Sequence, residues 1–118
     1  MKHLFCVLIV LSVCQSACFS AWAESLRRLG GSEIAVRFKG KEFTDQVHWA
    51  LTFDKGGRLN SFSMGRASTG RWLIEKDELC LDRENNGSRC YEVWASGKTV
   101  QLRREPELPE EGILQKSH

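Results

Sequence analysis

Hydrophobic and polar residues alternate along most of the chain after Gly40. From Val47 to Phe53, apolar side chains occupy every second position, and polar or small side chains lie between them. This period of two predicts a strand with one buried face. A second strand is expected to follow the turn at 54–57 and to run through Leu59 and Phe62. A bulge is expected there, because these two apolar residues are out of phase.

Turn-forming residues recur at intervals of about eight to eleven residues in the rest of the chain, which is typical of a meander of short antiparallel strands. These turn signals are Ser68-Thr69-Gly70, Lys76-Asp77, Asn86-Gly87, Ser96-Gly97 and the segment 106–109. The strand-like segments between them are Arg71 to Glu75, Glu78 to Asp82, Arg89 to Ala95 and Lys98 to Arg104, with Ile113 and Leu114 after the last turn. The pattern therefore predicts a mainly β fold, a small antiparallel meander or barrel of about seven strands.

The segment from Glu24 to Gly40 has a helical or irregular pattern. Its apolar residues recur at steps of three and four positions, and Gly30-Gly31 interrupts them. Ser32 is suited to cap a short helix, and Gly40 is suited to end it. We expect one or two short N-terminal helices packed on the edge or mouth of the sheet.

Residues 1–23 have the features of a signal peptide. Lys2 is followed by an almost unbroken apolar run from Leu4 to Val13, and Ala21-Trp22-Ala23 places small residues where signal peptidase requires them. Residues 24–118 are then expected to form a single β-rich domain in the periplasm or the medium. The apolar run is shorter than the roughly 20 residues that span a bilayer, so no stable membrane span is expected.

Two of the five cysteines remain after the predicted cleavage. Cys80 and Cys90 lie in strand-like segments on either side of Asn86-Gly87, which is a strong hairpin signal. Cys80 lies six residues before Asn86 and Cys90 lies three residues after Gly87, and they are expected to face each other across the hairpin. Because cysteine pairs become disulfides in an oxidising compartment, the sequence predicts one disulfide between Cys80 and Cys90.

Composition and the lack of catalytic motifs favour a non-enzymatic protein. The chain has 17 Lys and Arg against 15 Asp and Glu, which excludes a strongly basic nucleic-acid binder. His48 lies on the polar phase of its predicted strand, and no serine stands in a nucleophile-elbow pattern. Asp45 and His48 could offer two metal ligands, but no third or fourth is spaced to complete a site. We expect no catalytic residue, no metal and no cofactor.

One further pattern runs along most of the predicted domain. It comprises Gly31-Ser32-Glu33-Ile34, Phe38, Gly40-Lys41, Gly70-Arg71-Trp72, Leu79-Cys80, Cys90 and Gly97. This series resembles a group of small exported proteins of unknown function from alphaproteobacteria. The resemblance implies a short helix followed by a β-meander with one disulfide, and it implies no activity. Gly70-x-Trp72 is also similar to the G-x-W signature of lipocalins, which bind small apolar ligands inside a β-barrel.

These observations predict a protein that acts by binding. The first hypothesis is an interaction module or inhibitor that binds a protein partner. The alternative is a lipocalin-like carrier of a small apolar ligand. The aromatic residues expected to form the core, or else to line a pocket or partner site, are Trp49, Phe53, Phe62, Trp72 and Trp94.

The first testable prediction is export with cleavage after Ala23. The intact mass of protein recovered from periplasm or medium should match a chain that starts at Glu24, because signal peptidase cleaves after closely spaced small residues. A lipoprotein is the competing form: Cys18 follows a small residue, but Gln15 stands where a lipoprotein carries an aliphatic one. Recovery of a lipid-modified Cys18 species would contradict the prediction.

Overall fold

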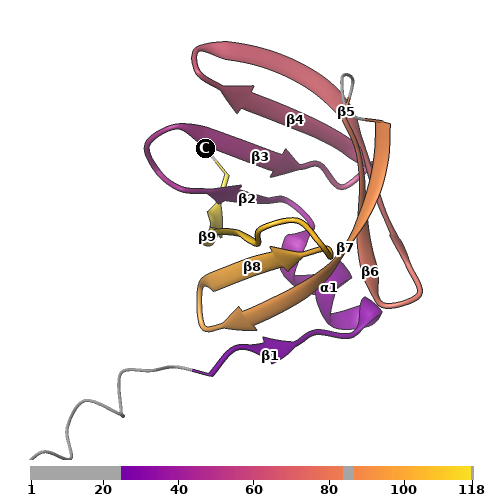
Figure 1. Ribbon diagram of the computed structural model, residues 1–118. Coiled ribbons are helices and arrows are strands. Elements are labelled where there is room, and N and C mark those ends of the chain that lie inside the picture. The colour runs from indigo at the N-terminus through magenta and orange to yellow at the C-terminus, as the bar shows by residue number, and fades with distance from the viewer. Residues whose placement is uncertain (1–24, 84–86, 118) are drawn as a thin grey trace, which may run out of the picture.

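The computed structural model describes residues 25–83 and 87–117, which form nine strands and one helix (Figure 1). In chain order these are β1 (Arg27–Arg28), α1 (Gly31–Phe38), β2 (Lys41–Thr44), β3 (Trp49–Phe53), β4 (Arg58–Ser63), β5 (Arg66–Glu75), β6 (Glu78–Arg83), β7 (Gly87–Ser96), β8 (Thr99–Arg103) and β9 (Glu110–Lys116). The predicted signal peptide, and Asn86 of the predicted hairpin turn, lie outside the described residues.

Strands β2 to β9 form a closed antiparallel barrel. Each strand pairs with the next along the chain, and β9 returns to pair with β2. The separate strand β1 pairs with the second half of β7. The mainly β prediction is confirmed, but the barrel contains eight strands where about seven were expected. Of the one or two helices expected, the described residues contain one, because the segment before Gly30 is extended.

Helix α1 covers one end of the barrel (Figure 1). Ile34 and Phe38 are four residues apart, so they share the helix face that is buried against the barrel. Ser32 does not cap this helix: Gly30 is the N-cap residue and supplies no side chain. The cap comes from a distant turn, where Asp77 Oδ1 accepts a hydrogen bond of 2.7 Å from the Gly31 N–H. A carboxylate at this end also complements the helix dipole.

Aromatic rings fill the part of the core next to α1. Phe38 meets Phe53 edge-on with ring centroids 5.0 Å apart, and Phe53 meets Trp72 at 5.6 Å. Phe43 packs beside Phe38 at 6.4 Å. The Trp72 indole N–H donates to the Asp54 carbonyl at 2.9 Å, so its one polar group is satisfied. Truncating such a buried ring costs about 3–5 kcal/mol of stability, so these rings account for much of what holds the helix to the barrel.

The predicted turn at Ser68-Thr69-Gly70 is wrong, because these residues continue β5. The chain reverses earlier, at Met64-Gly65, where both residues have positive φ angles of 54° and 80°. Gly70 serves a different purpose: a Cβ there would lie 2.0 Å from the Asp82 carbonyl oxygen. Glycine is thus required for a close approach of two strands, a use that sequence alone does not distinguish from a turn.

The predicted disulfide is present. Cys80 on β6 and Cys90 on β7 are directly opposite each other, and their sulfur atoms are bonded. The bridge lies on the outer side of the sheet, because the flanking residues of β6, Leu79 and Leu81, are buried in the core. It therefore links two neighbouring strands without taking up space in the barrel.

Replacing both Cys80 and Cys90 by Ala should lower the free energy of unfolding by roughly 2.5–3 kcal/mol, because the bridge closes a short loop in the unfolded chain. Guanidinium denaturation followed by far-ultraviolet circular dichroism measures this difference. The spectrum of the folded variant should remain of the β type. Thiol titration of the unfolded, unreduced native protein is the control, and two reactive thiols there would contradict the bridge.

Candidate binding surface

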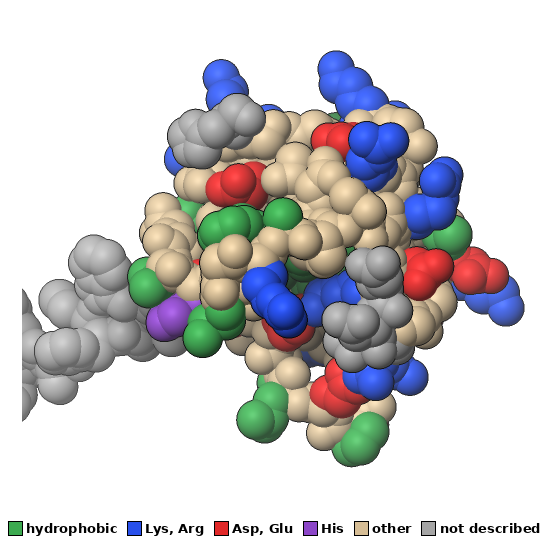
Figure 2. Space-filling model, turned by 90° about the horizontal axis from the view of Figure 1, so that it is seen from above, with side chains coloured by type: hydrophobic (Ala, Val, Ile, Leu, Met, Phe, Trp, Pro, Cys, Tyr) green, Lys and Arg blue, Asp and Glu red, His purple; other side chains and the backbone are tan. Residues whose placement is uncertain are grey.

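Exposed apolar side chains gather at one end of the barrel. Among the described residues, six large hydrophobic side chains are exposed, and three of these lie on two adjacent hairpins. Val47 is 78% exposed in the β2–β3 loop, and Phe62 and Met64 are 53% and 78% exposed at the end of the β4–β5 hairpin. Figure 2 shows hydrophobic side chains beside the purple histidine at this end of the molecule. Together they form an apolar patch that solvent reaches freely.

Strand register brings the two hairpins side by side. Ala50 on β3 is opposite Phe62 on β4, and Trp49 is opposite Ser63. Beyond the paired residues, the Met64 N–H donates to the His48 carbonyl at 3.2 Å. The two tips are therefore held together by main-chain contacts.

Two adjoining hollows of about 480 and 450 Å³ lie on the outer side of the barrel next to these tips. Both are lined by Glu42, Ala50 and Phe62. The first continues over small and polar side chains of β3, β4 and β5, namely Thr52, Asn60, Ser61, Ala67, Ser68 and Thr69. The second continues to the β2–β3 loop and includes Val47 and His48. We call the surface formed by Val47, Ala50, Phe62, Met64 and Ala67 the tip face.

Asp45 organises the loop that presents Val47. Its Oδ1 atom accepts main-chain hydrogen bonds from Val47, His48 and Trp49 at 3.0, 2.7 and 3.0 Å. Its Oδ2 atom lies 2.9 Å from Nδ1 of the exposed His48 ring. Partial desolvation alone would raise the pKa of Asp45, but these hydrogen bonds outweigh it and hold the pKa well below its usual range. Asp45 therefore holds the β2–β3 loop in place through main-chain hydrogen bonds, and the exposed His48 ring lies on its solvent side.

The five aromatic residues expected in the core or at a site fall into two groups. Phe53 and Trp72 are buried in the core, and Trp49 packs edge-on against Phe43, partly buried. Phe62 and Trp94 are not core residues, because both point to the outer side of the sheet. The bulge expected between Leu59 and Phe62 is absent. These two residues are out of phase because Leu59 faces inward and Phe62 faces outward on a regular β4. Trp94 instead stacks under the Arg103 guanidinium, 4.2 Å from the ring centroid.

A cluster of partly exposed charged side chains has no counterpart in the sequence-based expectations. Arg83 on β6 pairs with Glu110 on β9 at 3.1 Å, although these strands are not neighbours. Arg89 pairs with Glu107 beside it. Burial raises the pKa of Tyr91, which lies among these four charges. The alternation of side chains along β6 and β7 could have indicated this cluster, because Arg83, Arg89 and Tyr91 all occupy inward positions of these strands.

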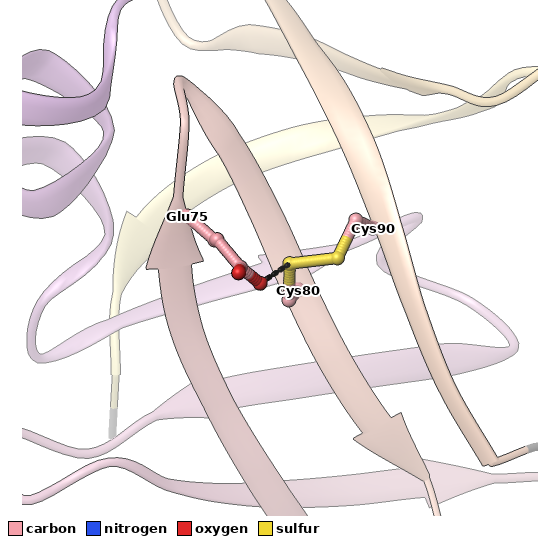
Figure 3. Close-up of a disulfide and its surroundings, with 3 residues drawn as sticks. All are labelled: Glu75, Cys80 and Cys90. Atoms are coloured by element: carbon pink, nitrogen blue, oxygen red, sulfur yellow. Dashed lines mark hydrogen bonds between the residues drawn. A yellow bond between two sulfur atoms is a disulfide. The ribbon is translucent and has the colours of Figure 1, made fainter.

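Glu75, Cys80 and Cys90 lie close together on the outer side of the barrel (Figure 3). A carboxylate oxygen of Glu75 is 4.0 Å from Sγ of Cys80. Both sulfurs are bonded to each other, so neither offers the thiolate that a metal ion would bind. This group is therefore a disulfide with a neighbouring carboxylate.

Comparisons with known proteins do not assign a function to the tip face. No protein-family model, curated protein or solved structure matches the chain. Separately, no helix in the described part of the chain has both the length and the hydropathy of a membrane span.

The depressed pKa of Asp45 predicts an acid-sensitive contribution to stability. The contribution is present above the ordinary aspartate pKa of about 4 and is lost as the pH falls towards the lower folded-state value. From about pH 5 downwards, the native protein should therefore lose more unfolding free energy than Asp45→Asn, which has no carboxylate to protonate. Urea denaturation at a series of pH values measures the two slopes.

The matched control is Asp82→Asn, since Asp82 is exposed on β6 and no described residue forms a hydrogen bond with its carboxylate. That variant should keep the native slope. Equal slopes for the native protein and Asp45→Asn would show that the hold on the β2–β3 loop does not depend on the ionised carboxylate.

Proposed function

We propose that this protein is an exported, non-enzymatic binding module that holds a protein partner on the tip face. The observation that carries the proposal is the grouping of Val47, Phe62 and Met64 on two hairpins whose tips are joined by the hydrogen bond from the Met64 N–H to the His48 carbonyl. Exposed apolar side chains are common singly, but a contiguous group with polar residues around it is typical of an interaction site.

The surroundings of the tip face suit a protein partner. Glu42, Asn60 and Gln115 place carboxylate and amide groups around the apolar side chains. The Gln115 amide donates to Glu42 at 2.9 Å, so this part of the rim is held in place before any partner arrives. Phe62 stands above a floor of small side chains, so a partner side chain can pack beside its ring. The hollows are open and shallow, which favours a protein surface over an enclosed small molecule.

The alternative, a carrier of a small apolar ligand, has weaker support. In lipocalin-like carriers the ligand occupies the barrel interior. Here Phe38, Phe43, Phe53 and Trp72 occupy the interior beside α1, with ring centroids in packing contact. The partly exposed pair of Arg83 and Glu110 joins β6 to β9 across the barrel. An outer-surface site for a protein partner accounts better for the exposed residues.

The proposal predicts that polar substitution of the tip face abolishes partner capture. A triple variant with Val47→Ser, Phe62→Ser and Met64→Ser should lose the partners that the immobilised mature protein captures from periplasmic and medium extracts. Loss of buried apolar contacts at an interface centre typically weakens binding by about 2 kcal/mol or more per anchor. Quantitative mass spectrometry of the captured proteins provides the measurement.

The matched control replaces three exposed apolar residues elsewhere on the protein, Val36→Ser, Leu73→Ser and Leu108→Ser. This variant should capture the same proteins as the native chain. If the tip-face variant captures them equally well, the tip face is not the binding surface. Circular dichroism of both variants verifies that each retains the β fold.

A further inference from the structure

A separate hollow of about 640 Å³ lies where the last turn of α1 meets the start of β2, the end of β9 and the β7–β8 turn. Hydrogen bonds join these elements to one another. The Ser117 hydroxyl donates to the Gly40 carbonyl at 3.2 Å, which ties the end of β9 to the start of β2. The Leu114 N–H donates to the Lys98 carbonyl at 2.8 Å, which ties the β7–β8 turn to β9. The walls of the hollow are therefore held in place by contacts between distant segments.

Four cationic side chains line this hollow, and each comes from a different segment. They are Arg37 on α1, Lys41 on β2, Lys98 in the β7–β8 turn and Lys116 on β9. None of the four forms an ion pair with a described residue. No Asp or Glu among the described residues lines the hollow. We call the site formed by these four side chains the cationic hollow.

The carboxylates that lie closest along the chain are engaged elsewhere. Glu42 on β2 accepts a hydrogen bond from the Gln115 amide at 2.9 Å. Glu33, one helical turn before Arg37, contacts the Arg27 guanidinium through both oxygens at 3.1 and 2.8 Å. The hydrogen bond from Arg27 contributes most to the lowered pKa of Glu33, and the charge of Arg37 contributes least. Neither carboxylate therefore neutralises the cationic hollow.

Two of the lysines are directly opposite each other where the barrel closes. Lys41 on β2 is paired with Lys116 on β9, so both side chains leave the same face of the sheet. Like charges at directly opposite positions destabilise an antiparallel pair. An anion that contacts both ammonium groups removes this repulsion. The pair is therefore unfavourable by itself and favourable in a complex with an anion.

Part of the lining is apolar. Leu114 on β9 is half-buried and packs against the core, and Gly97 contributes main chain only. The methylene stems of long cationic side chains add further apolar surface below their charged ends. A ligand with a charged group and an apolar part can therefore contact both kinds of surface. A phosphate monoester suits the charged position, because it carries a charge of about −1.5 to −2 and three acceptor oxygens.

We infer that the cationic hollow binds a phosphate monoester that carries an apolar part. The phosphate oxygens accept hydrogen bonds from Lys41, Lys116 and the other two cations, and the apolar part lies against Leu114. Gln115 borders both this hollow and one of the tip-face hollows, but the inference does not rest on the proposed protein partner. Phosphate monoesters occur as free molecules and as lipid headgroups, and these two sources share the chemistry that the hollow recognises.

The first experiment titrates isotopically labelled mature protein with hexyl phosphate. Nuclear magnetic resonance should show saturable shifts of the amide signals of Gly97, Lys98 and Gln115. Inorganic phosphate lacks the apolar part and should bind about tenfold or more weakly. Hexanoate has one charge and two oxygens, so it should also bind about tenfold or more weakly. Absence of saturable shifts with hexyl phosphate, or equal binding of either comparison compound, would overturn the inference.

The double variant Lys41→Gln with Lys116→Gln separates a ligand site from a structural role. It should bind hexyl phosphate about tenfold or more weakly, because both ammonium groups are lost. In buffer without phosphate, its denaturation midpoint should equal or exceed the native one, because the like-charge pair is also lost. Native affinity or a lower midpoint in this variant would contradict the inference.

The matched control is Arg66→Gln with Arg71→Gln, which removes the same net charge from exposed residues that do not line the hollow. This variant should bind hexyl phosphate as the native protein does. An equal loss of affinity in the control would show that general charge attraction is sufficient and would overturn the site. The tip-face triple variant should also bind hexyl phosphate normally, so this inference and the proposed function can fail independently.

Vesicles distinguish the two sources of the phosphate monoester. The probe contains four parts phosphatidylcholine to one part phosphatidic acid, whose headgroup is a phosphate monoester. The control replaces phosphatidic acid by phosphatidylglycerol, whose phosphate is a diester. Sedimentation with the first vesicles alone would support the inference with a lipid ligand, and hexyl phosphate binding without sedimentation would support it with a free ligand. Equal sedimentation with both kinds of vesicle would show that the monoester is not selected and would overturn the inference.

Discussion

Strands β2 and β9 come from opposite ends of the described chain, and their pairing closes the barrel. Phe43 is opposite Leu114 and Thr44 is opposite Ile113, so the closure also completes the core layer around Phe43. Gly112 is needed at this seam, because a Cβ there would lie 2.6 Å from the Thr44 carbonyl oxygen and 3.0 Å from the Phe43 ring. Such a long-range contact must offset the entropy of closing a long loop. Every other strand pair in the barrel joins neighbours along the chain.

Closure also decides which surfaces remain for binding. A closed barrel removes the free edges of its strands, and most main-chain groups are then satisfied within the sheet. The first half of β5 pairs with β4, and its ladder with β6 runs from Arg71 opposite Asp82 to Glu75 opposite Glu78. The tip face lies against that same stretch. The apolar side chains of the tip face are thus positioned by the β3–β4–β5 register.

Partly exposed charged side chains also occupy inward positions of the barrel strands. The Arg83–Glu110 pair joins β6 to β9 across the barrel, while the rings near α1 fill the other part. The Arg83 Nε atom is buried without a partner among the described residues, so this pair does not satisfy the guanidinium completely. Ion pairs of this kind contribute less to stability than apolar packing does. The apolar core and the disulfide stabilise the domain by burial of apolar surface and by a covalent link between β6 and β7.

The strand period, the turn residues and the cysteine positions were enough to predict a β-meander with one Cys80–Cys90 bridge, because these features depend on neighbours along the chain. The same local signals misplaced the β4–β5 turn. Gly70 stands there for a contact with β6 that sequence cannot show, and Met64 is not a residue that marks a turn. Only the tertiary structure decided that Phe62 faces solvent beside Val47 and that Asp77 caps α1. Each of these depends on which distant strands meet and in what register, and no local pattern specifies that.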